Sequence, residues 1–466
     1  MSIAIDQKPL YRVIPIGQQV MFSVSDPVIV ASMYKVKFVA EVRVSNNLNI
    51  DPNLPDDLIG TFKTTPNNNG TGIFDLRPIL ETFVKPDHEP YLGSPLSAVS
   101  EYKGVAAATK TFPIHLVDKF SLNNNTIKFF AVRFLIEYSI SPNGQVVTPT
   151  NEEDSETFIM FNGVLQYDDI LDLVDSDYGY DMGDDYYLNS PTSSFLTTAP
   201  TTQYARLEDY GTLPFLNNMQ NGTFLLDNIV ISYIYPGGAL TDTIDWSSVN
   251  GGNNYQGSSS TRLAYFGAYP GNLQNWSATF ANAVSLGMTH YNVTAIGNVM
   301  DSYSQTYTIN ILCPNERGYD GIRLTWLNKW GGWDYYTFNM KSTKSITTNR
   351  TSYTQLGGTW NESAFKISGY KGGKKNFRVN STEKIKLNTD FVTEEEGVWF
   401  EQLINSPEVY VLEGFQSDPT YSSFNNYVQP ATITNSSYVR KTKANDKLMQ
   451  YTIEIEKSKM KRTQSV

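Results

Sequence analysis

Two long segments constrain the fold most, because each alternates apolar and polar side chains over a dozen positions or more. They are residues 34–45, YKVKFVAEVRVS, and residues 126–140, TIKFFAVRFLIEYSI. A two-residue period is typical of a strand with one buried face. The apolar face of the first contains Tyr34, Val36, Phe38, Ala40, Val42 and Val44, and that of the second contains Phe130, Val132, Phe134, Ile136 and Tyr138.

Shorter apolar runs separated by turn residues continue this pattern through residues 223–316. Tyrosine (30 residues) and phenylalanine (24 residues) are abundant, and both favour strands. We therefore predict a mainly β, multidomain protein with β-sandwich-like modules and a small α+β C-terminal part. The predicted parts are an N-terminal β-rich domain (1–165), an acidic connecting segment (166–220), a β-sandwich-like domain (221–345) and a C-terminal α+β domain with a basic tail (346–466).

The clearest helix signal lies at residues 393–405, TEEEGVWFEQLIN. Thr393 and Glu396 have the spacing of a capping box. Trp399 and Leu403 share one face at i and i+4, and Pro407 follows the predicted end.

An acidic tract at residues 168–185 holds eight aspartates in 18 residues. Five of them are weak candidates for Ca²⁺ ligands, because this ion prefers carboxylate and carbonyl oxygens. The spacing does not fit an EF-hand loop, so we expect a solvated acidic loop, no cofactor and no bound metal. The five candidates are Asp175, Asp177, Asp181, Asp184 and Asp185.

Charge is distributed unevenly between the two ends of the chain. Residues 1–340 carry 18 Lys/Arg and 34 Asp/Glu, a net of −16, and residues 341–466 carry 18 and 13, a net of +5. This asymmetry favours head-to-tail or ring contacts between copies, or two different partners; the simpler alternative is one acidic and one basic domain. Cys313 is the single cysteine, which excludes a disulfide within the chain. The N-terminal residues do not resemble a signal peptide, and no apolar run has the length of a membrane helix.

Motifs for catalysis and nucleotide binding are weak. The three histidines, His88, His115 and His290, show no zinc-ligand spacing. Residues 368–378, SGYKGGKKNFR, lack the spacing and the hydroxyl residue of a phosphate loop, so a basic β-turn is the favoured interpretation. The basic tail at 457–466 has no interleaved aromatic residues, and we expect no nucleic-acid partner.

Residues 328–340, NKWGGWDYYTFNM, gather aromatic side chains around a Gly-Gly pair. If Gly331 and Gly332 form a two-residue turn, paired positions sum to 663, with Trp330 opposite Trp333 and Lys329 opposite Asp334. This register places Trp326 and Tyr335 on one face and Leu327, Tyr336, Phe338 and Met340 on the other. The favoured interpretation is a structural hairpin covered on both sides. The alternative is an interface or glycan-binding platform formed by Trp330, Trp333 and Tyr335.

The same stretch carries a family resemblance. RLTWLNKWGGWDYYTF (323–338) resembles a motif, W-L-N-x-x-G-G-aromatic-D-Y-x-x-F, of virion structural proteins of tailed bacteriophages, especially those of Bacteroidetes-type or marine hosts. YKVKFVAEVRV with TGIFDLRPILETFV, and the ending SPEVYVLEG with VQPATITNSSYVRKTKANDKLMQYTIEIEKS, resemble the same group. The likeness touches the beginning, middle and end of the chain but not residues 166–320. It implies a tail or baseplate component and transfers no catalytic residue.

We therefore expect a non-enzymatic structural component of a tailed-phage virion, in the tail, baseplate or tail tip. The expected partners are further copies of the chain, as a homo-oligomer or ring, and other virion tail proteins. The protein is expected in the virion, after synthesis in the host cytoplasm without secretion or membrane insertion. The alternative is a receptor- or carbohydrate-binding module for host attachment that contacts a host surface glycan; a polysaccharide depolymerase is less favoured.

Overall fold

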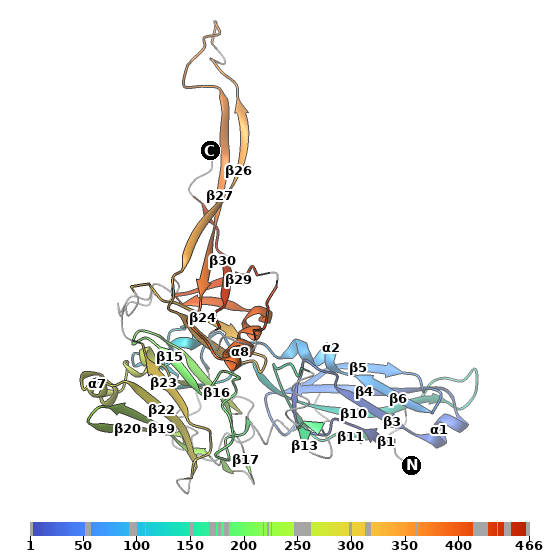
Figure 1. Cartoon of the computed structure of the whole chain (residues 1–466). Helices are drawn as coiled ribbons and strands as arrows, with labels where there is room; N and C mark the ends of the chain where they lie inside the picture. Colours follow the sequence, from blue (N-terminus) through green and yellow to red (C-terminus); the bar gives the residue numbers. More distant parts are fainter. Residues whose placement is uncertain are drawn as a thin grey trace. The chain divides into compact units, whose positions relative to one another are not determined.

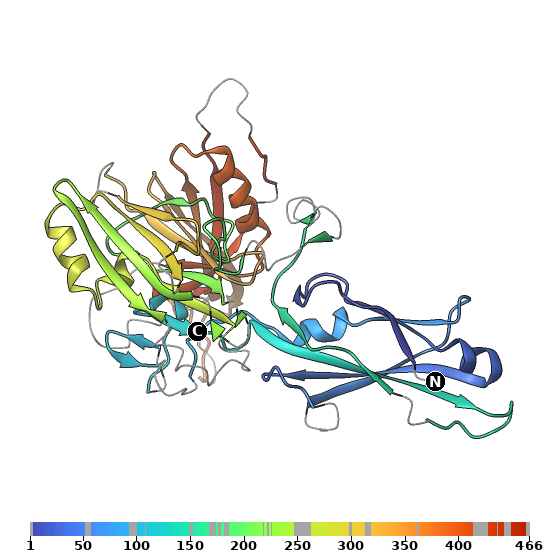
Figure 2. The same cartoon turned by 90° about the horizontal axis from the view of Figure 1, so that it is seen from below.

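In the computed structural model, the two long alternating segments pair with each other in one sheet (Figures 1 and 2). They form strands β4 (Tyr34–Ser45) and β10 (Ile127–Ser139). The strands are antiparallel, with Phe38 opposite Ile136 and Val42 opposite Val132. Residues directly opposite each other point to the same side of a sheet, so both apolar faces meet one core. The predicted strand positions are confirmed, and so is the burial of Phe38, Ala40 and Val42 on β4 and of Phe130, Val132, Phe134 and Ile136 on β10. Tyr34, which was predicted on the buried face, is 48% exposed at the end of β4.

The structure describes most of the chain. The described residues are 3–51, 57–92, 100–107, 109–148, 152–166, 174–175, 179–180, 186–217, 219–220, 223–224, 226–246, 262–297, 301–312, 318–359, 362–412, 427–435, 437–441 and 449–462. They form a mainly β protein with several separate sheets, which confirms the predicted fold class. None of the helices among these residues is long and apolar enough to cross a membrane.

The chain divides into two compact units. Unit 1 comprises residues 1–312 and 327–334, and unit 2 comprises residues 313–326 and 335–466. The predicted boundaries near residues 165, 220 and 345 are not boundaries between these units. In particular, the predicted 221–345 domain is shared between both units, because its last hairpin has its turn in unit 1 and most of both strands in unit 2.

The N-terminal part of unit 1 is a two-sheet sandwich. One sheet has the order β1-β3-β6, and the other has the order β2-β12-β10-β4-β5, with β11 also pairing with β10. The remaining strands are β1 (Ala4–Gln7), β2 (Val13–Pro15), β3 (Met21–Ser25), β5 (Leu58–Thr64), β6 (Thr71–Asp75), β11 (Glu152–Asp154) and β12 (Phe158–Phe161). Short helices accompany them: α1 (Pro27–Ser32), α2 (Arg77–Leu80) and the 3₁₀ helix η2 (Glu81–Phe83).

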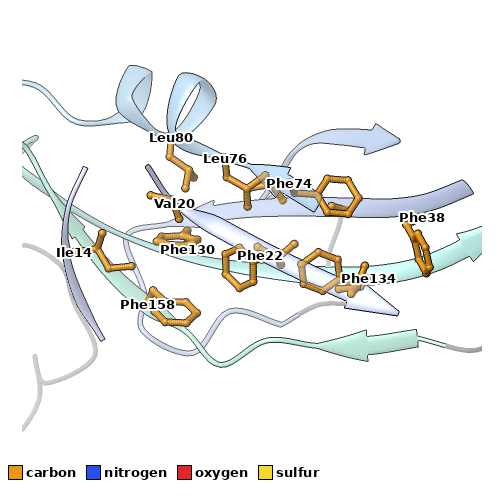
Figure 3. Close-up of a cluster of buried hydrophobic side chains, with 14 of the residues drawn as sticks. Ile14, Val20, Phe22, Phe38, Phe74, Leu76, Leu80, Phe130, Phe134 and Phe158 are labelled. Atoms are coloured by element: carbon orange, nitrogen blue, oxygen red, sulfur yellow. The ribbon is translucent and has the colours of Figure 1, made fainter. Parts of the chain in front are cut away.

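An aromatic cluster joins the two sheets of this sandwich (Figure 3). Phe22 of β3 lies 5.5 Å, between ring centroids, from Phe134 of β10, and Phe74 of β6 lies 5.7 Å from the same ring. Full burial of one such side chain stabilises the fold by about 1.5–3 kcal/mol. Since the cluster draws on both sheets, it explains why the alternating strands need a second layer.

The rest of unit 1 is built on two further sheets. A five-stranded sheet has the order β15-β23-β22-β19-β20, and a three-stranded sheet has the order β16-β21-β9. The strands are β9 (Phe120–Leu122), β15 (Thr202–Ala205), β16 (Thr212–Leu216), β19 (Leu226–Tyr235), β20 (Gly238–Asp245), β21 (Leu263–Gly267), β22 (His290–Gly297) and β23 (Tyr307–Ile311). Because β9 pairs with β21, a segment of the predicted N-terminal domain completes a sheet of the following region.

Smaller elements complete unit 1. They are the strand pairs β7 (Glu101–Tyr102) with β8 (Val105–Ala106), β13 (Val174–Asp175) with β14 (Gly179–Tyr180) and β17 (Met219–Gln220) with β18 (Thr223–Phe224), and the helices η3 (Ile114–Leu116), α6 (Pro270–Leu273) and α7 (Ala278–Ser285). Helix α7 begins where the Ser277 side chain accepts a hydrogen bond from the Phe280 N–H. Phe280 packs against Tyr233 of β19, with ring centroids 5.5 Å apart.

Unit 2 is built on one sheet with the order β25-β24-β28-β29-β30-β27-β26, and β31 also pairs with β27. The strands are β24 (Ile322–Leu327), β25 (Trp333–Phe338), β26 (Thr343–Gln355), β27 (Gly373–Asn388), β28 (Val409–Leu412), β29 (Val428–Ile433), β30 (Thr452–Lys457) and β31 (Lys461–Arg462). Helix α8 (Glu394–Asn405) has the predicted capping box of Thr393 and Glu396, and Trp399 and Leu403 are buried as expected.

Candidate interaction surface

The turn of the β24–β25 hairpin is built around Asn328. Its backbone N–H donates to the Gly332 carbonyl at 2.8 Å, and its carbonyl accepts from the Gly331 N–H at 3.1 Å. The Asn328 side-chain oxygen also accepts from the N–H groups of Trp330 and Gly332, both at 3.0 Å. Gly331 has φ 79°, in the left-handed region. This is a three-residue loop with a glycine bulge, so the predicted two-residue Gly331–Gly332 turn is wrong.

The longer loop changes the register of the hairpin. With Asn328 paired to Gly332, opposite positions sum to 660 rather than 663. The Arg323 side chain accordingly donates to the Thr337 hydroxyl at 2.9 Å. An odd shift moves the side chains of one strand to the other face relative to its partner. Trp326 therefore shares a face with Tyr336 rather than with Tyr335, and the predicted face assignment is wrong.

The corrected register explains the packing of helix α8 in unit 2. The Trp326 ring lies 4.8 Å from the Trp399 ring, and the Tyr336 ring lies 4.8 Å from the Phe400 ring, between centroids. Phe338 stacks on Phe400 at 6.1 Å. This face of the hairpin packs against helix α8, and its aromatic side chains form a core with those of the helix.

The three aromatic residues of the expected platform are buried. Trp330 and Trp333 are each 1% exposed and Tyr335 is 3% exposed. Trp330 packs against Phe161 and Tyr186, and Trp333 packs against His88 and His115. The expected Trp330–Trp333 contact is therefore replaced by separate sets of neighbours. A ring buried to this degree presents no face to a sugar, so these residues do not form an exposed platform.

The turn residues of the family motif act as a hub inside unit 1. The Trp333 indole N–H donates to the Asp87 carbonyl at 2.8 Å, and Asp334 accepts from the Thr197 hydroxyl at 2.6 Å. A Cβ on Gly331 would overlap the Asn162 carbonyl oxygen, and one on Gly332 would lie 2.5 Å from Pro214. Segments far apart in sequence thus converge on residues 327–334, which we call the hub turn.

Lys329 and Asp334, which the two-residue turn placed opposite each other, lie in different surroundings in the hub turn. The Lys329 ammonium lies over the Trp330 ring, 4.8 Å from its centroid. Asp334 accepts a hydrogen bond from the Asn328 side-chain amide at 2.9 Å, in addition to that from Thr197. The carboxylate is buried, and these neutral donors stabilise it.

Most of the acidic tract lies outside the described residues, including Asp177, Asp181, Asp184 and Asp185. Asp175 is described only by its backbone, in strand β13. Within the described part of the chain, no three His, Cys, Asp or Glu side chains are grouped to hold a metal ion. The expected absence of a metal at these aspartates, and the calcium alternative to it, therefore stay a prediction and a hypothesis.

Strands β26 and β27, with the connecting residues 356–372, form a second hairpin, which we call the arm. It extends away from the remainder of the unit 2 sheet as a long ribbon (Figure 1). Almost every described residue of β26 is exposed, and β26 is the last strand of its sheet. Within β27, residues 384–388 pair with β30, and residues 380 and 381 pair with β31. Residues 373–379 of β27 pair with β26 alone among the described strands, so this part of the arm is a two-stranded ribbon.

Apolar side chains gather at the end of this ribbon. Leu356, Phe365, Ile367 and Tyr370 are 66%, 65%, 86% and 78% exposed. The loop is nevertheless ordered by its own hydrogen bonds, such as that from the Thr359 N–H to the Lys366 carbonyl at 3.0 Å. Large apolar side chains exposed together in one loop suit an interaction site, and we call these four residues the apolar tip.

Basic side chains flank the tip. Residues 343–388 contain nine Lys/Arg and two Glu, a net of +7. At the base of the arm, Lys384 and Lys386 pair with Glu456 and Glu454 of β30 at 3.4 and 3.5 Å. Among the described residues, Lys374, Lys375 and Arg378 have no such carboxylate partner. We call these three residues the basic flank.

The C-terminal tail helps to anchor the base of the arm. The Lys461 ammonium lies 2.5 Å from the Glu383 carboxylate, and that of Lys457 lies 3.5 Å away. The hydrogen bond from Lys461 lowers the pKa of Glu383 below its ordinary value of 4.5, and the charge of Lys457 acts in the same direction. Residues Lys461–Arg462 of the basic tail therefore contribute a short strand, β31, that pairs with β27.

The arm was not predicted from the sequence. Residues 343–355, TKSITTNRTSYTQ, are rich in threonine and free of glycine and proline, which is a strand signal. They lack an apolar face, however, so the two-residue period that indicates a half-buried strand is absent. Residues 368–378, predicted as a basic β-turn, contain the turn from Ser368 to Lys371 and the start of β27.

Comparison with known proteins adds little. No protein-family model matches the chain, and no curated protein matches it. Among solved structures, the chain is similar to alpha-2-macroglobulin of Escherichia coli, in its native conformation by cryo-EM and in its trypsin-activated form. Both are 8% identical, with a TM-score of 0.20, over 83% and 84% of this chain. The chain spans 22% and 23% of those proteins, and a likeness at this TM-score supports no statement about function.

Proposed function

We propose that this chain is a non-enzymatic structural component of a tailed-phage virion, in the tail, baseplate or tail tip, and that it works by assembly. The observation that carries the proposal is the arm, a ribbon whose apolar tip and outer strand edge are exposed. A two-stranded ribbon is only marginally stable by itself in water, and a free strand edge is a template for pairing with another chain. Such an element is best explained by a partner.

The family resemblance supports the virion as the place of assembly. Its central motif coincides with the hub turn and with the strands that carry it, where Asn328, Gly331 and Asp334 hold the structure together. A motif with this role identifies a related scaffold rather than a reaction. It therefore agrees with a structural role and supplies no catalytic group.

Host attachment is the second candidate. Trp330, Trp333 and Tyr335 are buried and are therefore not candidates for glycan binding. The exposed rings of Phe365 and Tyr370 at the apolar tip remain candidates, since aromatic side chains bind sugars by stacking. The two functions differ in what the tip contacts: another virion protein, or a host surface glycan.

Purified phage particles test both functions. We expect mass spectrometry of washed particles to contain this chain in a fixed ratio to other tail proteins, and cryo-EM to show the arm in contact with protein. Absence of the chain from particles would contradict the proposal. Intact particles that carry Tyr370→Ser, assemble normally and fail to adsorb would favour attachment. Shortening of host glycan by the purified chain would contradict a non-enzymatic role.

A further inference from the structure

We infer that the arm docks on unit 1 of a second copy of this chain, with the basic flank opposite carboxylates and the apolar tip in contact with that copy. This inference rests on the proposed function, because it names the partner through which the chain assembles. It follows from four properties of the described residues: the incomplete sheet, the apolar tip, the unneutralised cations and the charge of the two units.

The outer edge of β26 is the first property. Thr343–Gln355 pairs with β27 on one side, and on its other side none of the described strands pairs with it. Proteins blunt such edges with proline or short strands, or cover them. Within these 13 residues there is no proline, and only Lys344 and Arg350 are charged. The edge is therefore suited to lie against another protein surface.

The positive charge of the basic flank implies that the partner surface is negatively charged. Arg378 lies opposite Thr351, and Lys375 lies opposite Tyr353, so both cations project from one face of the ribbon. On that face nearer the base, Lys384 and Lys386 already face Glu456 and Glu454. The chain thus neutralises the cations at the base of the arm with its own carboxylates. The basic flank near the tip is left to pair with carboxylates of a second copy.

Unit 1 offers the complementary charge. It carries 16 Lys/Arg and 32 Asp/Glu, a net of −16, whereas unit 2 carries 20 and 15, a net of +5. Exposed carboxylates of its described part include Glu153 on β11 and Asp301. Two arms would repel each other, because each has a net charge of +7. The favoured contact is therefore heterologous, arm to unit 1, and it repeats from copy to copy.

Sedimentation of the full-length chain tests the contact through matched variants. Lys375→Glu in the basic flank is expected to raise the self-association Kd about tenfold, while Lys459→Glu, an exposed lysine of unit 2 outside the arm, leaves it within about twofold. Ile367→Asp is expected to weaken association by a similar factor, and Val439→Asp, at an exposed valine outside the arm, is the control. Circular dichroism confirms that each variant is folded.

Cross-linking of a mixture of ¹⁴N- and ¹⁵N-labelled copies identifies the surface. A zero-length amine-to-carboxylate reagent is expected to join Lys374 or Lys375 to Asp or Glu residues of unit 1 in a copy with the other label. Arm-to-arm links, links only within one copy, or equal effects of Lys375→Glu and Lys459→Glu would overturn the inference. A chain that stays monomeric at all concentrations would overturn it too. If that monomeric chain is still found in particles, the proposed function stands and the partner is another virion protein.

Discussion

The hub turn and the arm are both parts of β-hairpins, but they lie in opposite surroundings. In the hub turn, Trp330 and Trp333 are buried, and the Asn328 side chain accepts hydrogen bonds from the Trp330 and Gly332 N–H groups. In the arm, Ile367 and Tyr370 face solvent, and the outer strand edge is open. The aromatic side chains of the hub turn are buried by contacts within the chain, whereas the apolar side chains of the arm are exposed.

This difference teaches how to separate stability from interaction in a chain rich in aromatic residues. Residues 328–340 are dense in tryptophan and tyrosine, but Trp330 and Trp333 pack within unit 1, and Tyr336 and Phe338 pack within unit 2. The threonine- and lysine-rich arm has a less conspicuous sequence and a more exposed structure. Substitutions in the hub turn should therefore change folding, and substitutions in the arm should change association.

The largest expected effect is that of Trp333→Ala. Removing this buried ring and its hydrogen bond to Asp87 should lower the free energy of unfolding of unit 1 by about 3–5 kcal/mol. Tyr370→Ala in the apolar tip should change it by less than about 0.5 kcal/mol. Unfolding by denaturant, monitored through hydrogen exchange of amides in each unit, provides the measurement. Equal effects of the two variants would break the comparison.

Asn328→Ala should have the next largest effect. The substitution removes the acceptor for the Trp330 and Gly332 N–H groups and leaves buried donors without partners, at a cost of about 2–4 kcal/mol. Asn349→Ala, at an exposed position of β26, is the matched control, with an expected change within about 0.5 kcal/mol. An Asn328→Ala protein as stable as the parent would show that the side chain does not organise the loop.

Two glycines with nearly equal positive φ sharpen the comparison further. Gly331 has φ 79° and Gly373 has φ 80°. A Cβ on Gly331 would overlap the Asn162 carbonyl oxygen, whereas nothing lies within 4 Å of one on Gly373. Gly373→Ala should cost about 1 kcal/mol from backbone strain alone, and Gly331→Ala at least about 2 kcal/mol. Similar losses for both, in hydrogen exchange of the respective hairpins, would argue against the crowding of the hub turn.

The smallest expected effect concerns pH at the base of the arm. The pKa of Glu383 is lowered in the folded chain by Lys461 and Lys457. Its contribution to stability is therefore full above the ordinary pKa of 4.5 and is lost as the pH falls through the lower folded value. The protection of the Lys461 and Arg462 amides, relative to their intrinsic exchange rate at each pH, should fall in that acidic range, and Glu383→Gln should remove the dependence. Unchanged pH dependence in that variant would assign the effect to another group.

Burial decided which features the sequence could predict. The alternation in 34–45 and 126–140 fixed which faces are buried, and the capping box of Thr393 and Glu396 located a helix, because both signals are local. The hairpin register was missed because the Asn328 side chain converts the loop from two residues to three. The sharing of β9 between regions was missed because strand pairing over 140 residues leaves no local trace. The arm has no apolar face, so periodicity could not reveal it.

Hydrogen exchange measured across a range of protein concentrations tests most directly the claim that the hub turn is internally complete and the arm is not. The account predicts that the amides of Thr343–Gln355 that face away from β27 exchange rapidly in dilute protein and become protected as copies associate, while those of residues 327–334 are protected throughout. Protection of the arm that is the same at every concentration, or a hub turn whose protection depends on association, would contradict it.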